Sequence, residues 1–109
     1  MKNCIFCRIV RGEMESNVVW EDKNVLAFTD IKPVADVHIL FIPKKHVEDF
    51  AELKDDKVLA SMRRGAQEMI GAQKLMGKGY KIQVNGGGAQ IIPHLHFHLI
   101  GPIGEAAEV

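Results

Sequence analysis

An alternating run near the end of the chain places three histidines at every second position, from His94 to His98. Successive side chains of a strand point to opposite faces, so this run predicts a strand over residues 94–100 with all three imidazoles on one face. The apolar residues between them then point to the opposite face. Three imidazoles on one face are costly to bury without partners, which favours a functional role over a structural one.

The chemistry of this row depends on its spacing and on the glycine run that precedes it, Gly86-Gly87-Gly88. Alternate residues on a strand are about 6.6 Å apart and the outer pair about 13 Å, so one metal ion can bind two of the histidines but not three. Glycines at positive φ let successive N–H groups form a concavity that binds anions such as phosphate. Imidazole acts as a nucleophile, an acid or a base near pH 7. Together these features predict phosphoryl or nucleotidyl transfer through a phosphohistidine.

Length and charge limit what the chain can bind. Its 109 residues are enough for one domain, residues 1–109, and too few for a second. Lys plus Arg and Asp plus Glu number 14 each, so no overall basic field attracts a nucleic acid polymer or an anionic membrane. No apolar run has the length of a signal peptide or a membrane span, which predicts a cytoplasmic protein. The expected partner is therefore a small molecule whose phosphate is recognised locally.

Apolar periodicity and turn residues predict an α+β fold. A short helix over residues 4–11, ended by Gly12, precedes about five mostly antiparallel strands, at 18–21, 25–29, 38–43, 80–85 and 94–100. One long helix lies between the third and fourth strands, capped by Asp55 or Asp56 and ended by Gly77 and Gly79. Gly65 and Gly71 either weaken this helix or permit close packing. Its predicted core stripe is Val58, Leu59, Met62, Ala66, Met69 and Ile70.

The two cysteines, Cys4 and Cys7, form a C-x-x-C arrangement. In a reducing compartment this spacing indicates redox chemistry or a metal before it indicates a structural disulfide. Redox motifs of this kind accompany a βαβ pattern, which the predicted elements do not contain. A zinc site needs two further ligands, and from spacing alone the pair is half a metal site, a redox pair or two free thiols.

The stretch His94–Ile100 resembles the His-φ-His-φ-His-φ-φ signature of the histidine triad (HIT) family of nucleotide hydrolases and transferases. Three further segments, residues 4–10, 26–31 and 38–46, are similar to the same family, and the resemblance spans about residues 3–101. The Hint-like branch, of the purine nucleoside phosphoramidase type, is the most similar because the chain is short. The resemblance implies a homodimer in which the long helix packs against the partner.

For function, the resemblance implies hydrolysis of purine nucleoside phosphoramidates, or related nucleotidyl compounds, at the α-phosphate. The reaction passes through a covalent nucleotidyl-histidine and needs no organic cofactor. A dinucleoside polyphosphate hydrolase uses the same covalent step, and a nucleotide-binding or adaptor module keeps the pocket with little turnover. Both alternatives remain open at this point.

The same resemblance assigns roles to individual residues. It makes His96 the nucleophile, His98 the donor to a phosphate oxygen or leaving group, and His38 their support. It also implies that Asp30 binds the ribose hydroxyls, although an aspartate three residues before Pro33 is equally typical of a turn. The remaining implied sets are Asn85 and Gln90 at the phosphate, Ile5, Phe6, Ile9, Phe28 and Ile31 around the purine, and Cys4, Cys7, His46 and His94 as ligands of a structural zinc ion.

The chain departs from the family pattern in the segment before the triad. The family carries Gly-Gln followed by Ser or Thr, whereas this chain has Ala89-Gln90-Ile91, and its loop after Asn85 is one or two residues shorter. Because a positioned hydroxyl is missing, we expect kcat to fall more than nucleotide affinity. Pro93 lacks an N–H and restricts the residue before it, so the loop is expected to reach the triad strand by another path.

Overall fold

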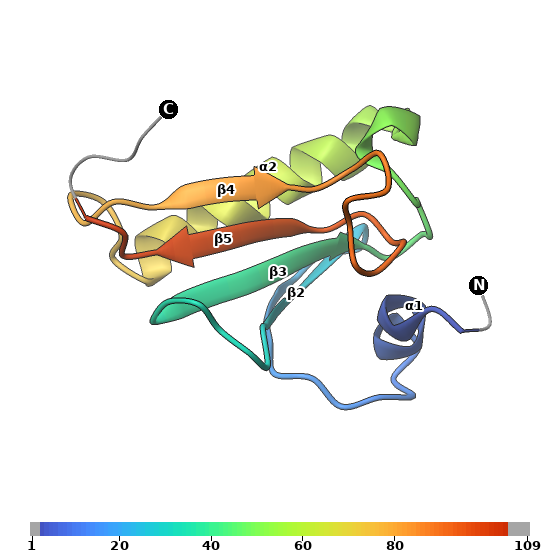
Figure 1. The fold of residues 1–109 in the computed structure, drawn as a ribbon, viewed down its shortest axis with the longest axis horizontal. Coiled ribbons are helices and arrows are strands. Elements are labelled where there is room, and N and C mark those ends of the chain that lie inside the picture. The colour runs from blue at the N-terminus through green and yellow to red at the C-terminus, as the bar shows by residue number, and fades with distance from the viewer. Residues whose placement is uncertain (1–2, 105–109) are drawn as a thin grey trace.

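The computed structural model describes residues 3–104 (Figure 1), and the domain predicted for residues 1–109 extends beyond this range at both ends. The strands are β1 (Val18–Glu21), β2 (Val25–Thr29), β3 (Val37–Pro43), β4 (Lys81–Val84) and β5 (Phe97–Gly101), and the helices are α1 (Ile5–Val10), the short 3-10 helix η1 (Phe50–Glu52) and α2 (Asp56–Ala72). The strands form one sheet in the order β1-β2-β3-β5-β4, and every neighbouring pair is antiparallel. The predicted α+β fold with one short and one long α-helix is confirmed.

The β1–β2 hairpin follows from the turn at residues 22–24. The carboxylate of Asp22 accepts hydrogen bonds from the N–H groups of Asn24 and Val25, both at 2.8 Å. Such a local side-chain bond replaces ladder partners in a tight turn and fixes where the second strand begins. The register of β2 against β3 then runs from Val25 opposite Pro43 to Thr29 opposite Ile39.

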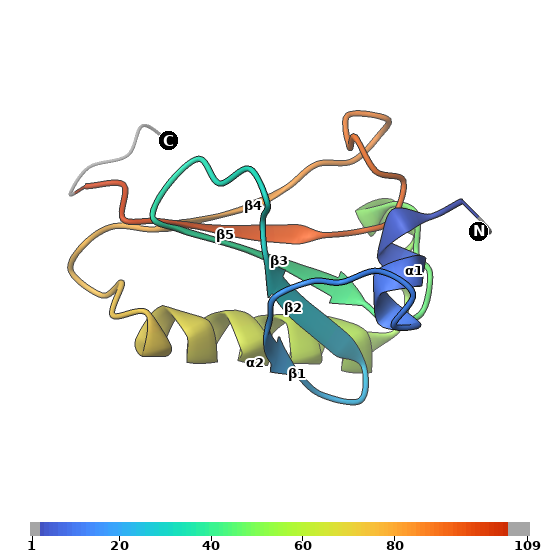
Figure 2. The same ribbon diagram turned by 90° about the horizontal axis from the view of Figure 1, so that it is seen from below.

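The two faces of the sheet carry different cores, because adjacent residues of a strand point to opposite sides. Figure 2 shows α2 lying along one face. There its buried residues pack on alternate strand residues such as Ala27, Ile39 and Leu99. On the other face, α1 packs through Phe6 against a second cluster of Leu26, Phe28, Leu40 and Ile42. The histidines of β3 and β5, His38 and His98, alternate with residues of the α2 core.

Close packing explains one glycine of α2. The helix begins after Asp55, whose carboxylate accepts from the N–H of Lys57 at 2.9 Å. A Cβ atom at Gly65 would lie 2.7 Å from the ring of Trp20, so only glycine lets the helix approach β1 this closely. Met62 and Met69 are buried, which confirms that the methionines of this helix belong to the core.

Two details of the predicted helix are wrong. It ends at Ala72 instead of at Gly77 or Gly79, because the chain turns back through Lys74, at φ 56°, to bury Leu75, which is 1% exposed. Leu59 is 40% exposed and does not belong to the core stripe. The burial of one leucine in the tertiary structure therefore ends the helix before it reaches the glycines that were predicted to stop it.

The predicted triad strand begins too early. Strand β5 starts at Phe97, which pairs with both β3 and β4. His94 and His96 therefore lie before the strand. The N–H of His94 bonds to the carbonyl of Ile92 at 2.8 Å, and the N–H of Leu95 bonds to the carbonyl of Val47 at 2.6 Å. Pro93 stands at the start of this irregular path.

Residues 86–93 form what we call the glycine loop. Its first half is a turn closed by a hydrogen bond from the N–H of Ala89 to the carbonyl of Gly86 at 3.2 Å. Gly87 and Gly88 occupy positive φ angles of 66° and 95°, which favour glycine. Within residues 3–104 no helix combines the length and the apolar character needed to cross a membrane.

Candidate functional site

The His96 ring is held by the main chain. Its Nδ1 lies 2.8 Å from the carbonyl oxygen of His94. A carbonyl can only accept, so Nδ1 carries a proton, and in the neutral form of the ring the lone pair is on Nε2. This is the only hydrogen bond to the ring among the described residues. The side chain is buried, and its centroid lies 4.9 Å from that of His98. The arrangement orients Nε2 of His96, the nitrogen that can act as a nucleophile, and sets the ring beside a second imidazole.

A chain of donors fixes the protons of the neighbouring imidazoles. The N–H of Val34 lies 3.3 Å from Nδ1 of His38, which must therefore accept. The proton of His38 is then on Nε2, which lies 2.9 Å from Nδ1 of His98. Because Nδ1 of His98 accepts, its own proton is on Nε2, and that buried atom has no hydrogen-bond partner within residues 3–104. An N–H donor is thus left for a ligand.

Burial keeps His98 neutral. Desolvation lowers its pKa to about 4, with further lowering by His96 and His38, while Asp30 acts in the opposite direction. An imidazole with this pKa is an uncharged donor throughout the neutral range. The proton assignment made from the hydrogen bonds and this electrostatic effect therefore agree.

Asp30 lies beside His38 and in a local turn. One carboxylate oxygen accepts from the N–H of Lys32 at 2.8 Å, and the other lies 3.4 Å from Nε2 of His38. The position of Asp30 is therefore compatible both with a turn residue and with a ligand of the ribose, because a turn carboxylate still has lone pairs free for hydroxyl groups. Lys32 and Val34, the two donors of this loop, were not expected from the sequence.

The residues predicted around the purine are only partly brought together. Phe6, Ile9 and Phe28 lie in one cluster, and the Phe6 ring meets those of Phe28 and His96 edge-on at centroid distances of 5.6 and 5.1 Å. Ile5 is half-exposed at the start of α1, and Ile31 is 92% exposed in the loop after β2. The structure thus has an aromatic floor beside the triad, with Ile5 and Ile31 free of the cluster.

The N-terminal cysteines and two histidines form a compact group of metal-binding atoms. The ligand atoms of Cys4, Cys7, His46 and His94 all lie within 4.8 Å of one another. Nδ1 of His94 lies 3.3 Å from Sγ of Cys4, and Nδ1 of His46 lies 3.2 Å from Sγ of Cys7. In a tetrahedral site with Zn–S of 2.3 Å and Zn–N of about 2.0 Å, sulfur and nitrogen are about 3.5 Å apart. The spacing therefore fits zinc.

The protonation of this group also suits a cation. Nε2 of His94 lies 2.8 Å from the carbonyl oxygen of Pro43 and must donate to it, which leaves the lone pair of Nδ1 facing the cysteines. Burial lowers the pKa of His94 to about 4, so its imidazole is neutral, as a ligand must be. Burial and a hydrogen bond with Cys4 raise the pKa of the Cys7 thiol, and a bound cation would reverse this effect.

The side chain of Gln90, predicted at the phosphate, forms hydrogen bonds that tie the glycine loop together. Its oxygen accepts from the N–H of Gly88 at 3.0 Å and its nitrogen donates to the carbonyl of Glu48 at 3.1 Å. Asn85, also predicted at the phosphate, accepts a hydrogen bond from Gln83 at 3.4 Å. Asp49, absent from the sequence predictions, accepts from the N–H of Gly87 at 2.6 Å. In the sequence, Asp49 is recognisable only as an aspartate before a short helix, which indicates a helix cap. Such a position does not predict a contact with a loop 38 residues away.

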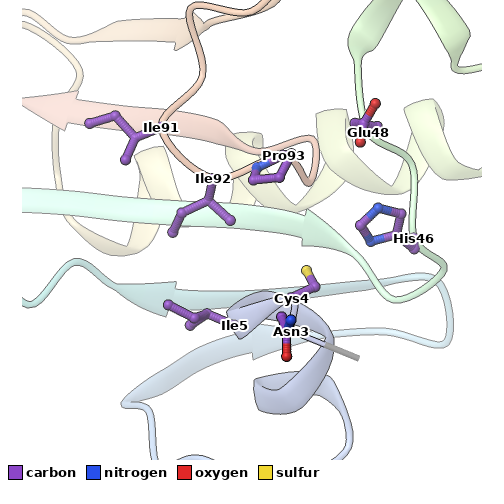
Figure 3. A pocket seen from close by; sticks show the side chains of 8 residues that line it. All are labelled: Asn3, Cys4, Ile5, His46, Glu48, Ile91, Ile92 and Pro93. Atoms are coloured by element: carbon purple, nitrogen blue, oxygen red, sulfur yellow. The ribbon is translucent and has the colours of Figure 1, made fainter. Parts of the chain in front are cut away.

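A cleft of about 540 Å³ opens between the start of α1 and the second half of the glycine loop (Figure 3). Ile92 faces α1 across it, and Cys4 and His46 lie at one end (Figure 3). Of the predicted site residues it includes Ile5, Cys4 and His46, but neither His96 nor His98. The cleft thus borders the metal-binding group, while His96 packs against the Phe6 ring and does not line the cleft.

Comparison with known proteins agrees with this geometry. The family described as "Scavenger mRNA decapping enzyme C-term binding" matches residues 3–107. The chain is 44% identical over 100 residues to an uncharacterized HIT-like protein of Methanocaldococcus jannaschii. The matched region covers 89% of this chain and 77% of that protein. It is 35% identical over 112 residues to the adenosine 5′-monophosphoramidase HNT1 of Candida albicans, covering 95% of this chain and 73% of that protein.

Solved structures are similar along the same length. A HIT family hydrolase from Legionella pneumophila has a TM-score of 0.84 at 44% identity and covers 91% of this chain and 92% of its own. A HIT family hydrolase from Clostridium thermocellum has a TM-score of 0.91 at 34% identity, and the match covers 100% of this chain and 98% of that chain. A zinc-bound histidine triad protein from Mycobacterium smegmatis has a TM-score of 0.82 at 33% identity, covering 91% and 74%. The chain belongs to the histidine triad family.

Proposed function

We propose that the chain is a nucleotide hydrolase that acts at the α-phosphate of purine nucleoside phosphoramidates through a covalent nucleotidyl-histidine. The observation that carries the proposal is the His96 ring, whose Nδ1 is bonded to the His94 carbonyl and whose centroid lies 4.9 Å from that of His98, a residue whose Nε2–H has no partner within residues 3–104. A nucleophile next to a neutral donor is the pair that displacement at phosphorus requires. The phosphoramidase similarity supports this substrate class.

In the first step, Nε2 of His96 attacks the α-phosphorus and the bond from phosphorus to the leaving amine breaks. The leaving nitrogen takes up the Nε2 proton of His98, either directly or by way of a phosphate oxygen, and departs as the amine, while His38 holds His98 in the tautomer that allows this. In the second step water attacks the phosphorus, the bond to His96 breaks, and the proton lost by the water returns to His98, so the enzyme returns to its starting state.

The substrate's nucleoside lies against the aromatic cluster in this proposal. Phe6, Ile9 and Phe28 form the floor for the purine, and the exposed Ile5 and Ile31 cover it. Asp30 accepts from the ribose hydroxyls. Asn85 contacts the phosphate, and Gln90 acts through the loop that it ties together.

We also propose that Cys4, Cys7, His46 and His94 hold a structural zinc ion. Their spacing and the neutral state of His94 support this assignment, as does the zinc-bound relative. With four protein ligands the ion has no open position, so its contribution is to fold stability. His94 is then a ligand and a carbonyl partner of His96, not a base.

The test of function is incubation of the protein with adenosine 5′-phosphoramidate. We expect release of AMP and, after rapid acid-free quenching, a mass increase of one adenylyl group on the protein. Diadenosine tetraphosphate at the same concentration serves as the competing substrate. Faster cleavage of that compound would assign the other HIT activity, and intact nucleotide after prolonged incubation would leave only binding.

A homodimer is the remaining part of the proposal. Strand β4 lies at an open edge of the sheet (Figure 1), and all four of its residues are exposed. An unpaired edge with apolar side chains is a template for pairing with a second chain. We expect sedimentation at twice the chain mass, and Ile82→Glu on β4 to produce monomers. Val18→Glu on β1, at the opposite edge and similarly exposed (44% against 48% for Ile82), is the control that remains dimeric.

A further inference from the structure

The glycine loop of this chain is fastened to the segment before α2. Asp49 bridges the two, since one carboxylate oxygen accepts from the N–H of Ala51 at 2.9 Å and the other from the N–H of Gly87 at 2.6 Å. Gln90 forms a second link, to the carbonyl of Glu48. Two cross-links therefore hold a loop whose glycines alone would leave it with many conformations.

Close packing supports the same bridge. A Cβ atom at Gly86 would lie 2.9 Å from Oδ1 of Asp49, so the loop backbone rests directly on the carboxylate. The hydrogen bonds from Ala51 and Gly87 hold the pKa of Asp49 below its usual range, and it is ionised at neutral pH. A charged acceptor forms a stronger bond than a neutral one.

The links divide the N–H groups of the loop into two sets. Those of Gly87 and Gly88 donate to Asp49 and Gln90 and are occupied. Those of residues 90–92 donate no hydrogen bond within residues 3–104. The side chain of Ile92 packs against the cluster of Phe6, so this second half of the loop lies on the triad face of the sheet.

We propose that Asp49 is a positioning residue: by holding the first half of the glycine loop, it directs the N–H groups of residues 90–92 to the phosphate of the substrate. The inference rests on the proposed function for its substrate, and it changes which part of the loop binds the anion. The glycine run, the obvious phosphate cradle in the sequence, is committed to Asp49 and Gln90. The residues after it, where this chain carries Ile91 in place of a hydroxyl, supply backbone donors instead.

The first test uses the wild-type protein and needs no variant. We expect AMP to shift the amide NMR resonances of residues 90–92, while the resonance of Gly87 stays at the low-field position of an N–H bonded to a carboxylate. Adenosine, which lacks the phosphate, should leave both halves of the loop unchanged. Movement of the Gly87 resonance on addition of AMP would show that phosphate displaces Asp49 and would overturn the proposal.

The second test is Asp49→Ser. Serine still caps η1 but is too short to reach Gly87, so the variant separates the cap from the loop contact. We expect kcat to fall by about tenfold or more, because misplaced donors cost most in the transition state. AMP should bind severalfold more weakly and adenosine with unchanged affinity. The affinity for AMP relative to that for adenosine measures the contribution of the loop to phosphate binding even if no phosphoramidate is cleaved.

The matched control is Glu52→Gln, which removes the same charge from the same short helix without touching the loop. Its kcat and its affinities for AMP and adenosine should equal those of the wild type. Equal weakening of AMP and adenosine in Asp49→Ser would indicate a general structural role and overturn the assignment. Unchanged kcat and AMP affinity would overturn it as well.

Discussion

His96→Ala is expected to lose turnover of adenosine 5′-phosphoramidate by about a thousandfold or more while AMP still binds. The covalent bond needs the Nε2 lone pair, for which alanine offers no substitute, whereas affinity comes from the aromatic cluster and the loop. Steady-state kinetics and calorimetric titration with AMP measure the two effects separately. An unchanged melting temperature would show that the buried site keeps its fold.

Comparison with His98→Ala separates the nucleophile from the donor. A substrate whose leaving group departs as a stable anion, such as a p-nitrophenyl ester of AMP, has little need of a donor. We expect His98→Ala to regain adenylyl transfer to the protein with this ester and His96→Ala to remain inactive with both substrates. An adenylyl adduct on the His96→Ala protein, or more than a few per cent of wild-type turnover, would exclude His96 as the nucleophile.

Removal of the metal is expected to have the largest effect on stability. Structural zinc binding contributes on the order of 10 kcal/mol in small zinc domains. Loss of even a few kcal/mol lowers Tm by about 15 °C or more in a domain of this size. Cys4→Ser, or treatment of the wild type with a strong chelator, should therefore lower Tm markedly and release α1 from the sheet. Metal analysis of untagged protein should give one zinc per chain.

Two controls make the metal prediction specific. Re-addition of zinc should restore Tm to the chelated wild type but not to Cys4→Ser. His46→Ala should lose metal in the same way, although it leaves both thiols in place. Protein that contains no metal as purified and melts at the same temperature with and without chelator would contradict the zinc assignment.

Local signals in the sequence were sufficient for the first three strands. Asp22 and Pro43 act on the backbone beside them, so the bounds of β1, β2 and β3 were predicted to within one residue. The start of β5 was wrong because it depends on where two other strands end, and the end of α2 was wrong because it depends on the burial of Leu75. Neither cause is local to the residues it affects.

In the candidate site, too, the features with local causes were predictable and those with long-range causes were not. The alternation of the triad and the C-x-x-C pair are local patterns, and they marked the side chains that the structure gathers near α1. The exposure of Ile31 and the bridge from Asp49 to Gly87 depend on how distant loops meet. The sequence offers no short-range pattern for such contacts, and only the folded chain reveals them.

The alternation of the two cores along β3 has a consequence for how chains of this kind can change in length. Ile39 and Phe41 belong to the α2 core, while His38, which contacts His98, and Leu40, which belongs to the cluster of Phe6, lie on the opposite face. Inserting or deleting one residue within the strand exchanges these sets and removes stability and chemistry together. Length variation is therefore expected only where no such alternation exists, as in the glycine loop.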